Sequence, residues 1–414
     1  MKLVFPEEAL APVGKDTGKE TLWLILYKCE SEQPRPQHHQ NLNAHALAFV
    51  SAYNFANHFK PLKRKPPSKP SVIPQQTPQK YSNSIPVTSS RDQTTKDLLM
   101  TRVIDTHHHI LPDFFWRETN NAHNPVGGFA PPPWSASTML SFMDEAGIDI
   151  AVTSISTPGV HVGDDARARS LARRCNELSA ELMHTNPGRL GGFAALPLPD
   201  IDGALEELTY ALDVLKLDGV VLFSNSNGVY LGDARFAPVF AELERRGAVV
   251  FVHPTASPDP SARQLGLPDT LIDFTADTTR AVAQMHYSNR FARTPNVKYI
   301  FSHAGGTVPY VAGRWAVLDE MNVIPGAEER GTAADTLRRL YWDTAVSFGD
   351  PVLRMLKDIV GFDQVLFGSD FPYMRRDLAV NCVRKLEQTA VLTPDERTQV
   401  MSGNAIKLFP RFAR

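Results

Sequence analysis

After about residue 100 the sequence repeats one pattern, a short apolar run bounded by turn residues and usually followed by a stretch with helical periodicity. The apolar runs lie at 103–104, 150–155, 190–195, 219–223, 249–252, 298–301, 340–342 and 364–367. Helical periodicity marks, among others, residues 166–185, 203–215, 236–246 and 350–360. Near-continuous apolar strands that alternate with helices indicate a parallel sheet covered by helices.

Eight strand-and-helix repeats within about 310 residues predict an α/β fold, a (β/α)8 TIM barrel that occupies residues 100–414. A doubly wound sheet is the alternative. That fold usually carries a glycine-rich phosphate loop after its first strand, and no such loop follows residue 104. The barrel is therefore the preferred interpretation.

The chain before the barrel has a different character. Residues 31–99 are rich in Pro, Gln, Ser, Asn and His and show no periodic apolar pattern. A segment of this composition cannot bury enough apolar surface to offset its ordering entropy, so we predict that residues 1–99 form a disordered extension. The basic stretch 63–70 fits a solvated linker better than a tail that binds a partner. We hypothesise that Met100 is the natural start and that residues 1–99 contribute little to the fold.

Charge and cysteine content limit the partners and the compartment. Lys and Arg total 43 and Asp and Glu total 45, which gives a net charge of -2 and no field that attracts nucleic acid or an anionic membrane. The apolar run 22–27 is too short to span a bilayer and lacks the features of a signal peptide. The three cysteines have no paired spacing, which argues against disulfides and against a cysteine zinc site. We expect a cytosolic protein that acts on a small organic molecule.

Five ionisable residues share one position in the repeats, directly after an apolar run. They are His107, His109, His253, His303 and Asp370. The carboxyl ends of barrel strands meet on one face, so residues far apart in sequence can surround one ion. A single histidine after a strand is more often a hydrogen-bonded structural residue, but five such placements point to a metal site.

The spacing of the first pair follows from strand geometry. Residues i and i+2 of a strand face the same side, so His107 and His109 can bind one metal while His108 points away. With His253 and Asp370 they form a set that suits Zn²⁺, with Mn²⁺ or Fe²⁺ as alternatives. We expect His303 to act as a nearby acid or base, or as a further ligand.

The remaining histidines and the end of the fourth strand limit the number of ligands and of metal ions that we predict. His123, His161, His184 and His286 fall in predicted helices or loops and are interpreted as ordinary residues, and those in the extension are discounted. A second metal would need a bridging group, commonly a carboxylated lysine at the end of strand four. That strand ends Leu222-Phe-Ser-Asn225, without a lysine, so we predict one metal ion.

Four ordered motifs resemble one enzyme family. They are Ile104-Asp-Thr-His-His-His-Ile-Leu-Pro112, Phe251-Val-His-Pro254, Phe301-Ser-His-Ala-Gly-Gly306 and Leu366-Phe-Gly-Ser-Asp-Phe-Pro372. Together they resemble the branch of the amidohydrolase superfamily that contains aminocarboxymuconate-semialdehyde decarboxylase, and within it the fungal 6-methylsalicylate decarboxylases of polyketide secondary metabolism. The resemblance covers residues 100–414. It implies metal ligation by His107, His109, His253 and Asp370, with His303 and Asp370 catalytic. Some relatives that act on dihydroxybenzoates lack the first histidine of the pair, so its presence here argues against a resorcylate substrate. The long extension is also unlike the family.

The resemblance implies non-oxidative decarboxylation of a 2-hydroxybenzoate, with 6-methylsalicylate converted to m-cresol and CO₂. Losing CO₂ directly would leave an aryl carbanion, so the ring carbon must be protonated first, and we expect Asp370 to donate that proton. The reaction is redox-neutral and needs no organic cofactor. Arg314 could pair with the substrate carboxylate, although a surface ion pair fits it equally well.

Other roles and readings remain open at this point. Phe114, Trp116 and Phe371 are candidates for either the pocket or the core, while Asp343 and Asn225 are weaker candidates for supporting roles. A mononuclear metal-dependent hydrolase of a lactone or amide is the alternative function, and a non-catalytic scaffold is a weaker one. We also expect a homodimer, as relatives often dimerise.

Overall fold

The computed structural model describes residues 102–119, 127–128, 130–259 and 266–413. The predicted extension 1–99 and His123 lie outside the described residues, so their interpretation stays a prediction. None of the helices in the described part of the chain has the length and apolar content needed to cross a membrane.

Eight parallel strands form the centre of the fold, with the order β1-β2-β3-β4-β7-β8-β9-β10. Their bounds are β1 Ile104–His109, β2 Ile150–Ser154, β3 Leu190–Ala195, β4 Gly219–Phe223, β7 Val249–His253, β8 Lys298–Phe301, β9 Tyr341–Asp343 and β10 Val365–Leu366. A separate two-stranded hairpin, β5 Asn225–Ser226 and β6 Val229–Tyr230, follows β4.

The sheet closes on itself between its first strand and the segment that follows its last. Thr106 N donates to Phe367 O at 2.9 Å, and His109 N donates to Phe371 O at 2.8 Å. His108 and Phe371 also form a parallel bridge. The eight strands therefore form a TIM barrel, as the alternation of apolar runs predicts.

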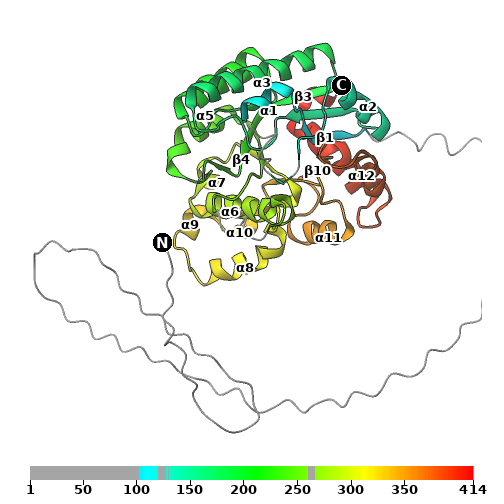
Figure 1. The fold of residues 1–414 in the computed structure, drawn as a ribbon. Helices are drawn as coiled ribbons and strands as arrows, with labels where there is room; N and C mark the ends of the chain where they lie inside the picture. Colours follow the sequence, from blue (N-terminus) through cyan, green and yellow to red (C-terminus); the bar gives the residue numbers. More distant parts are fainter. Residues whose placement is uncertain (1–101, 120–126, 129, 260–265, 414) are drawn as a thin grey trace, which may run out of the picture. The chain divides into compact units, whose positions relative to one another are not determined.

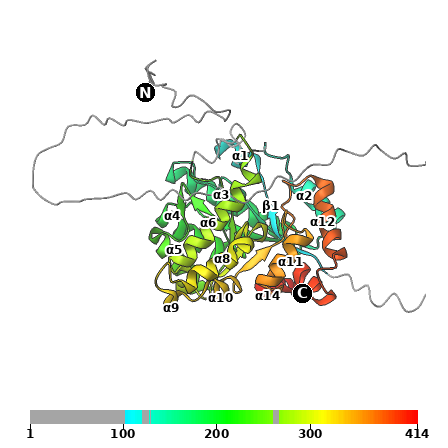
Figure 2. The ribbon, with the colours of Figure 1, turned by 90° about the horizontal axis from the view of Figure 1, so that it is seen from below.

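Helices surround the barrel on its outside, as Figure 1 shows for α3, α5, α6, α8, α11 and α12. The helices are α1 Asp113–Thr119, α2 Ala136–Ala146, α3 Asp165–Thr185, α4 Ile201–Thr209, α5 Ala237–Arg246, α6 Asp273–Tyr287, α7 Arg290–Arg293, α8 Val308–Glu320, α9 Ala327–Arg330, α10 Ala333–Leu337, α11 Asp350–Ile359, α12 Arg376–Gln388, α13 Pro394–Thr398 and α14 Asn404–Leu408. In Figure 2, α1 lies at one end of the barrel, and α9, α10 and α14 lie at the opposite end.

Local sequence explains where several helices begin and end. Helix α3 begins after Asp164, whose side chain accepts a hydrogen bond from Arg167 N. Helix α5 ends at Gly247, which has a φ of 58° that few residues other than glycine adopt without strain. The four predicted helices are all confirmed, and the second continues past α4 as a turn of π-helix, Tyr210–Val214.

Aromatic side chains pack inside the barrel beneath the carboxyl ends of its strands. Phe251 of β7 stacks on Phe193 of β3 with ring centroids 5.3 Å apart. The Phe251 ring also contacts His107, with centroids 5.0 Å apart. Both phenylalanines are buried, and burial of one such side chain contributes about 1.5–3 kcal/mol. This layer supports the polar residues at the strand ends from below.

Candidate metal centre

The three consecutive histidines are part of β1, and this corrects the predicted position of the first strand. We predicted a strand at 103–104 with the histidines behind it, but β1 runs to His109 and is buried along its whole length. The pairing register shifts between Asp105 and His108, and Asp105 Oδ1 accepts a hydrogen bond from His107 N at 3.0 Å. This irregularity belongs to the class of β-bulges, which often redirect side chains near active sites.

His107 and His109 point to a common place, as their spacing predicts. Their Nε2 atoms lie 3.1 Å apart. His108 faces elsewhere, because its ring stacks on Phe371 at 4.7 Å and its Nδ1 lies 2.8 Å from Asp105 Oδ2. The structure thus brings the predicted pair together and separates His108 from it.

The other three candidates come from the ends of β7, β8 and β10. The ligand atoms of His107, His253, His303 and Asp370 all lie within 4.8 Å of one another. His109 is next to this group, since its Nε2 is 3.3 Å from Asp370 Oδ1. We call these five residues the donor cluster. His303 Nε2 lies 3.4 Å from Asp370 Oδ2. This position is compatible with both predicted roles of His303, a further ligand and a nearby acid or base.

Asp343, the last residue of β9, orients two members of the donor cluster. Its Oδ2 lies 2.8 Å from His107 Nδ1, and its Oδ1 accepts a hydrogen bond from His303 N at 2.8 Å. Asp343 is fully buried. A carboxylate that holds Nδ1 leaves the Nε2 lone pair of the same ring free for a metal. The supporting role that the sequence suggested for Asp343 therefore has a geometric basis.

Two further histidines are oriented in the same way through Nδ1. His109 Nδ1 lies 3.2 Å from Ser154 Oγ, and His253 Nδ1 donates to its neighbour Pro254 O at 2.7 Å. All three imidazoles at the centre of the cluster therefore direct Nε2 inward. Such outer partners are typical of metal-binding histidines.

Burial and charge act against each other in the donor cluster. Burial disfavours a charged imidazole at His107, but the carboxylates of Asp343 and Asp370 outweigh this effect and raise the His107 pKa to about 10. Burial lowers the pKa of His109 and holds that of His253 well below its usual value. Burial opposes ionisation of Asp370, yet the charge of His107 and the nearby imidazoles of His109 and His303 keep the Asp370 pKa well below normal. The cluster thus contains an anionic Asp370, a protonated His107 and the neutral imidazoles of His109 and His253.

The donor cluster fits a divalent metal ion. Asp370 Oδ1 is buried and has no hydrogen-bond partner, although His107 Nε2 and His109 Nε2 lie only 3.2 and 3.3 Å from it. Buried polar atoms without a partner are rare and call for an explanation. A cation between these atoms would satisfy the carboxylate oxygen and both nitrogens at once. Imidazole and carboxylate donors are those that Zn²⁺ and Mn²⁺ accept.

A cavity of about 540 Å³ opens onto the donor cluster. We call it the first cavity. His253, His303 and Asp370 line it on the polar side. Its other walls are largely apolar and include Pro268, Leu271, Phe274, Val346 and Met374. The volume and the mixture of apolar walls with a few polar groups are typical of sites for small molecules.

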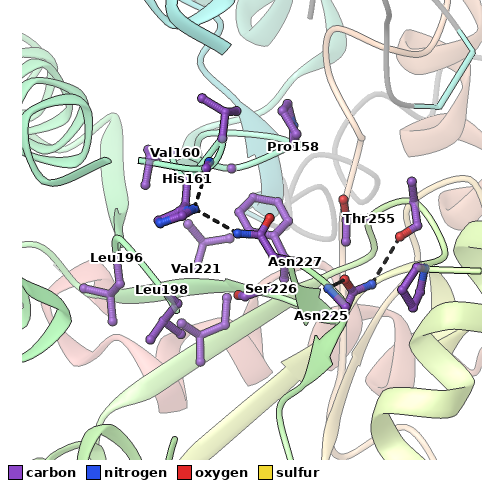
Figure 3. A pocket seen from close by; sticks show the side chains of 18 of the residues that line it. Pro158, Val160, His161, Leu196, Leu198, Val221, Asn225, Ser226, Asn227 and Thr255 are labelled. Atoms are coloured by element: carbon purple, nitrogen blue, oxygen red, sulfur yellow. Dashed lines mark hydrogen bonds between the residues drawn. The ribbon is translucent and has the colours of Figure 1, made fainter. Parts of the chain in front are cut away.

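A second cavity, of about 620 Å³, lies over the ends of β3 and β4 and contains none of the donor cluster (Figure 3). Leu196, Leu198 and Val221 line part of it, and Asn227 Nδ2 donates to His161 Nδ1 at 2.9 Å. A hydrogen bond of 2.7 Å between Thr157 of the first cavity and Thr255 of the second joins their walls. The larger cavity is therefore not the one beside the metal-binding atoms.

Arg314 is not brought to the first cavity. It is exposed on α8, about three turns after His303, and does not belong to the described lining. Its distance from His303 along the sequence does not reveal this placement.

The three aromatic candidates also lie elsewhere. Phe371 stacks on Phe142 with centroids 4.5 Å apart, Trp116 is buried, and Phe114 packs under the guanidinium of Arg174. None of the three is among the described residues that line the first cavity.

Sequence reasoning missed two hydroxyl residues and one aspartate. Ser156 and Tyr373 line the first cavity, two residues after β2 and three after Asp370. Ser156 could have been selected from the sequence in the same way as the donor cluster, because it follows directly after a predicted strand. Asp105 is buried and binds Ser369 N at 3.0 Å and Ser369 Oγ at 2.5 Å. This contact between the first strand and the segment that follows the last strand has no sequence signal, since it links residues at opposite ends of the domain.

The sequence is similar to a known family and to known decarboxylases. The family described as amidohydrolase matches residues 104–411. The 6-methylsalicylic acid decarboxylase of Aspergillus aculeatus is 37% identical over 321 residues, which cover 75% of this chain and 97% of that protein. The corresponding enzyme of Penicillium expansum is 36% identical, with 74% of this chain and 96% of that protein covered.

A solved structure shows the same fold with a metal. The 5-carboxyvanillate decarboxylase of Novosphingobium aromaticivorans, crystallised with manganese and a nitrobenzoic acid, superposes with a TM-score of 0.66 at 22% identity and covers 75% of this chain and 96% of its own. On these matches the chain belongs to the amidohydrolase family and, within it, to the metal-dependent decarboxylases.

Proposed function

We propose that this enzyme decarboxylates 6-methylsalicylate to m-cresol and CO₂ in fungal secondary metabolism. The observation that carries the proposal is the match to two 6-methylsalicylic acid decarboxylases along nearly their whole length. The donor cluster and the largely apolar first cavity give that match a physical basis, because together they offer a place for a carboxylate and for a methylated ring.

We further propose that His107, His109, His253 and Asp370 hold the metal ion and that Zn²⁺ is that ion. Three imidazoles and one carboxylate form a nitrogen-rich set that suits Zn²⁺. Mn²⁺ is the alternative, since a decarboxylase of the same fold was crystallised with it. When bound, the cation would chelate the carboxylate and the ortho oxygen of the substrate and favour the phenolate.

Asp370 and His303 are proposed to move the proton. The imidazoles around Asp370 keep it ionised, so it must accept a proton before it can donate one. The ortho hydroxyl of the substrate can supply that proton, and His303 Nε2, 3.4 Å from Asp370 Oδ2, can relay it or hold the carboxyl group in place. Delivery of the proton to the ring carbon makes the carboxylate a leaving group. Loss of CO₂ restores the aromatic ring, and the phenolate product takes a proton from water.

The hydrolase alternative is not favoured. No lysine follows β4, where the structure has Phe223, Ser224 and Asn225, so the usual bridge of a two-metal hydrolase is missing at that position. Asn225 Nδ2 instead donates a hydrogen bond to Asp277 Oδ2 at 2.8 Å.

A cytosolic location and a homodimer stay part of the proposal on the sequence arguments given above.

The test is to incubate the metal-loaded protein with 6-methylsalicylate and to follow m-cresol and CO₂ by chromatography. We expect stoichiometric formation of both, and loss of turnover in Asp370→Asn. Dialysis against a chelator should abolish activity, and added Zn²⁺ or Mn²⁺ should restore it and identify the better ion. Hydrolysis of a lactone without decarboxylation would overturn the proposal.

A further inference from the structure

Among the described residues that line the first cavity, two carry a buried polar atom with no hydrogen-bond partner, Asp370 Oδ1 and Ser156 Oγ. A cation accounts for the first. Ser156 is only 1% exposed, and no described protein group meets its hydroxyl in hydrogen-bonding geometry. Because an unsatisfied buried hydroxyl is costly, its position on a cavity wall points to a ligand that completes it.

The threonine hydroxyls of the same cavity are already used. Thr157 is hydrogen-bonded to Thr255, Thr270 donates to a backbone carbonyl at 3.3 Å, and Thr275 donates to Ile272 O at 2.8 Å. These contacts hold the cavity walls together. Ser156 therefore differs from these threonines in having a buried hydroxyl without a hydrogen-bond partner.

Tyr373 places a second hydroxyl beside Ser156. The two side chains interact, although they do not meet in hydrogen-bonding geometry. The position of Tyr373 is fixed from two directions, because its backbone N donates to Asp370 O at 2.9 Å and its ring packs edge-on against His109 with centroids 5.5 Å apart. The two hydroxyls thus lie on the wall next to the donor cluster.

The chemistry of the remaining wall limits what the hydroxyls can bind. The described lining contains no lysine and no arginine, and Arg314 lies outside it. Among the described residues of this wall, the side chains outside the donor cluster that can donate a hydrogen bond to an aromatic carboxylate are therefore hydroxyls. We propose that Ser156 and Tyr373 form a hydroxyl pair that binds the carboxylate of the ligand and distinguishes an aromatic acid from the corresponding phenol.

This inference rests on the proposed function only in taking an aromatic acid as the ligand. The chemistry of decarboxylation also favours uncharged hydrogen-bond donors, such as hydroxyls, for binding the carboxylate. A salt bridge to arginine would stabilise the carboxylate strongly in the ground state, and that stabilisation is lost when the group leaves as neutral CO₂. Two hydroxyls orient the carboxylate while stabilising it less in the ground state, so less stabilisation is lost when CO₂ leaves.

The test measures binding rather than turnover, with the metal-loaded full chain and two probes in a calorimeter. The first probe, 2-methylbenzoate, has the carboxylate but no ortho hydroxyl, and the second, m-cresol, has no carboxylate. We expect Ser156→Ala and Tyr373→Phe each to weaken binding of 2-methylbenzoate about tenfold, which is typical for loss of a hydrogen bond to a charged group, and to leave m-cresol within about twofold. Ser179→Ala is the matched control, because Ser179 is also buried with an unpartnered hydroxyl but lies on α3, outside the first cavity.

The outcomes separate this inference from the proposed function. Equal weakening of both probes would show that the hydroxyls only shape the cavity, and no change with either probe would mean that Ser156 binds water; both results overturn the inference. Failure of wild-type protein to bind 2-methylbenzoate overturns it as well. If the acid binds and depends on Ser156 but 6-methylsalicylate is not decarboxylated, the hydroxyl pair stands and the proposed substrate falls.

Discussion

At the scale of single residues, the candidate centre depends on side chains and backbone angles that hold a few atoms in place. His303 and Asp370 have φ values of 55° and 56°, in the left-handed region that residues other than glycine seldom adopt. Such conformations cost energy and are concentrated at functional sites. Both residues are in the donor cluster, which suggests that the backbone strain serves to direct these side chains inward.

Asp343 gives the sharpest test at this scale. Asp343→Asn replaces the carboxylate that faces His107 Nδ1 with an amide and so weakens control of the ring orientation. We expect metal affinity to fall about 10- to 100-fold, as is typical for loss of an outer partner. Competition with a chelator under metal-limited conditions would measure this change. Asp358→Asn, an exposed change on α11, is the control, and equal metal affinity in both variants would contradict the role of Asp343.

At the scale of elements, α6 connects the candidate site to the rest of the domain. Its first turn supplies Phe274 and Thr275 to the first cavity. Its middle carries the buried Asp277, which accepts a hydrogen bond from Tyr230 of the β5–β6 hairpin at 2.5 Å. Its last turn carries His286, whose two ring nitrogens are buried without partners. The helix therefore couples packing far from the cavity to the position of the cavity wall.

The pH dependence of the free energy of unfolding should reveal the lowered pKa of His286. Burial lowers its pKa from 6.5 to about 4 in the folded protein, so the unfolded chain binds a proton more readily than the folded chain. Its effect on stability is absent above pH 6.5 and becomes increasingly unfavourable as the pH falls from 6.5 towards 4. We expect His286→Leu to lose less stability than wild type between pH 7.5 and 5, in urea unfolding.

His184→Leu is the control for this experiment, since His184 is exposed near the end of α3. It should follow the wild-type pH profile. Parallel profiles of His286→Leu and wild type would show that the buried imidazole does not titrate in this way.

At the scale of the whole molecule, the described barrel is complete within residues 102–413. The chain returns to its first strand at 367–371, where Asp370 N donates to His107 O at 2.9 Å and Asp105 binds Ser369. The same closure that completes the sheet brings Asp370 to the histidines of β1. Folding of the barrel and assembly of the donor cluster are therefore one event.

This organisation predicts that residues 1–99 can be removed. A chain that begins at Met100 retains every strand of the described barrel and every candidate ligand, so we expect its melting temperature and its decarboxylase activity to equal those of the full chain. Differential scanning calorimetry and the m-cresol assay would measure both. A large loss of stability in the shortened chain would contradict the predicted division at residue 100.

Strand positions and most site residues could be predicted because they depend on local patterns. All eight apolar runs are strands in the structure, and no end differs by more than one residue except in β1. There the polar histidines conceal a strand that continues to His109, because residues at a barrel mouth are buried by their neighbours from other strands rather than by their own hydrophobicity. Position after a strand selected the five residues of the donor cluster because parallel strands all end on the same face.

The sequence by itself determined the barrel, the pairing of His107 with His109 and the exclusion of His108, since these follow from the period of two along a strand and from the repetition of strand and helix. The three-dimensional arrangement was needed to show that His303 lies within reach of the candidate ligand atoms, that Arg314 is outside the described lining of the first cavity, and that Ser156 and Tyr373 line it. The physical reason is that local periodicity fixes the face on which a side chain lies. Which side chains meet on that face depends on the register and closure of strands far apart in the chain.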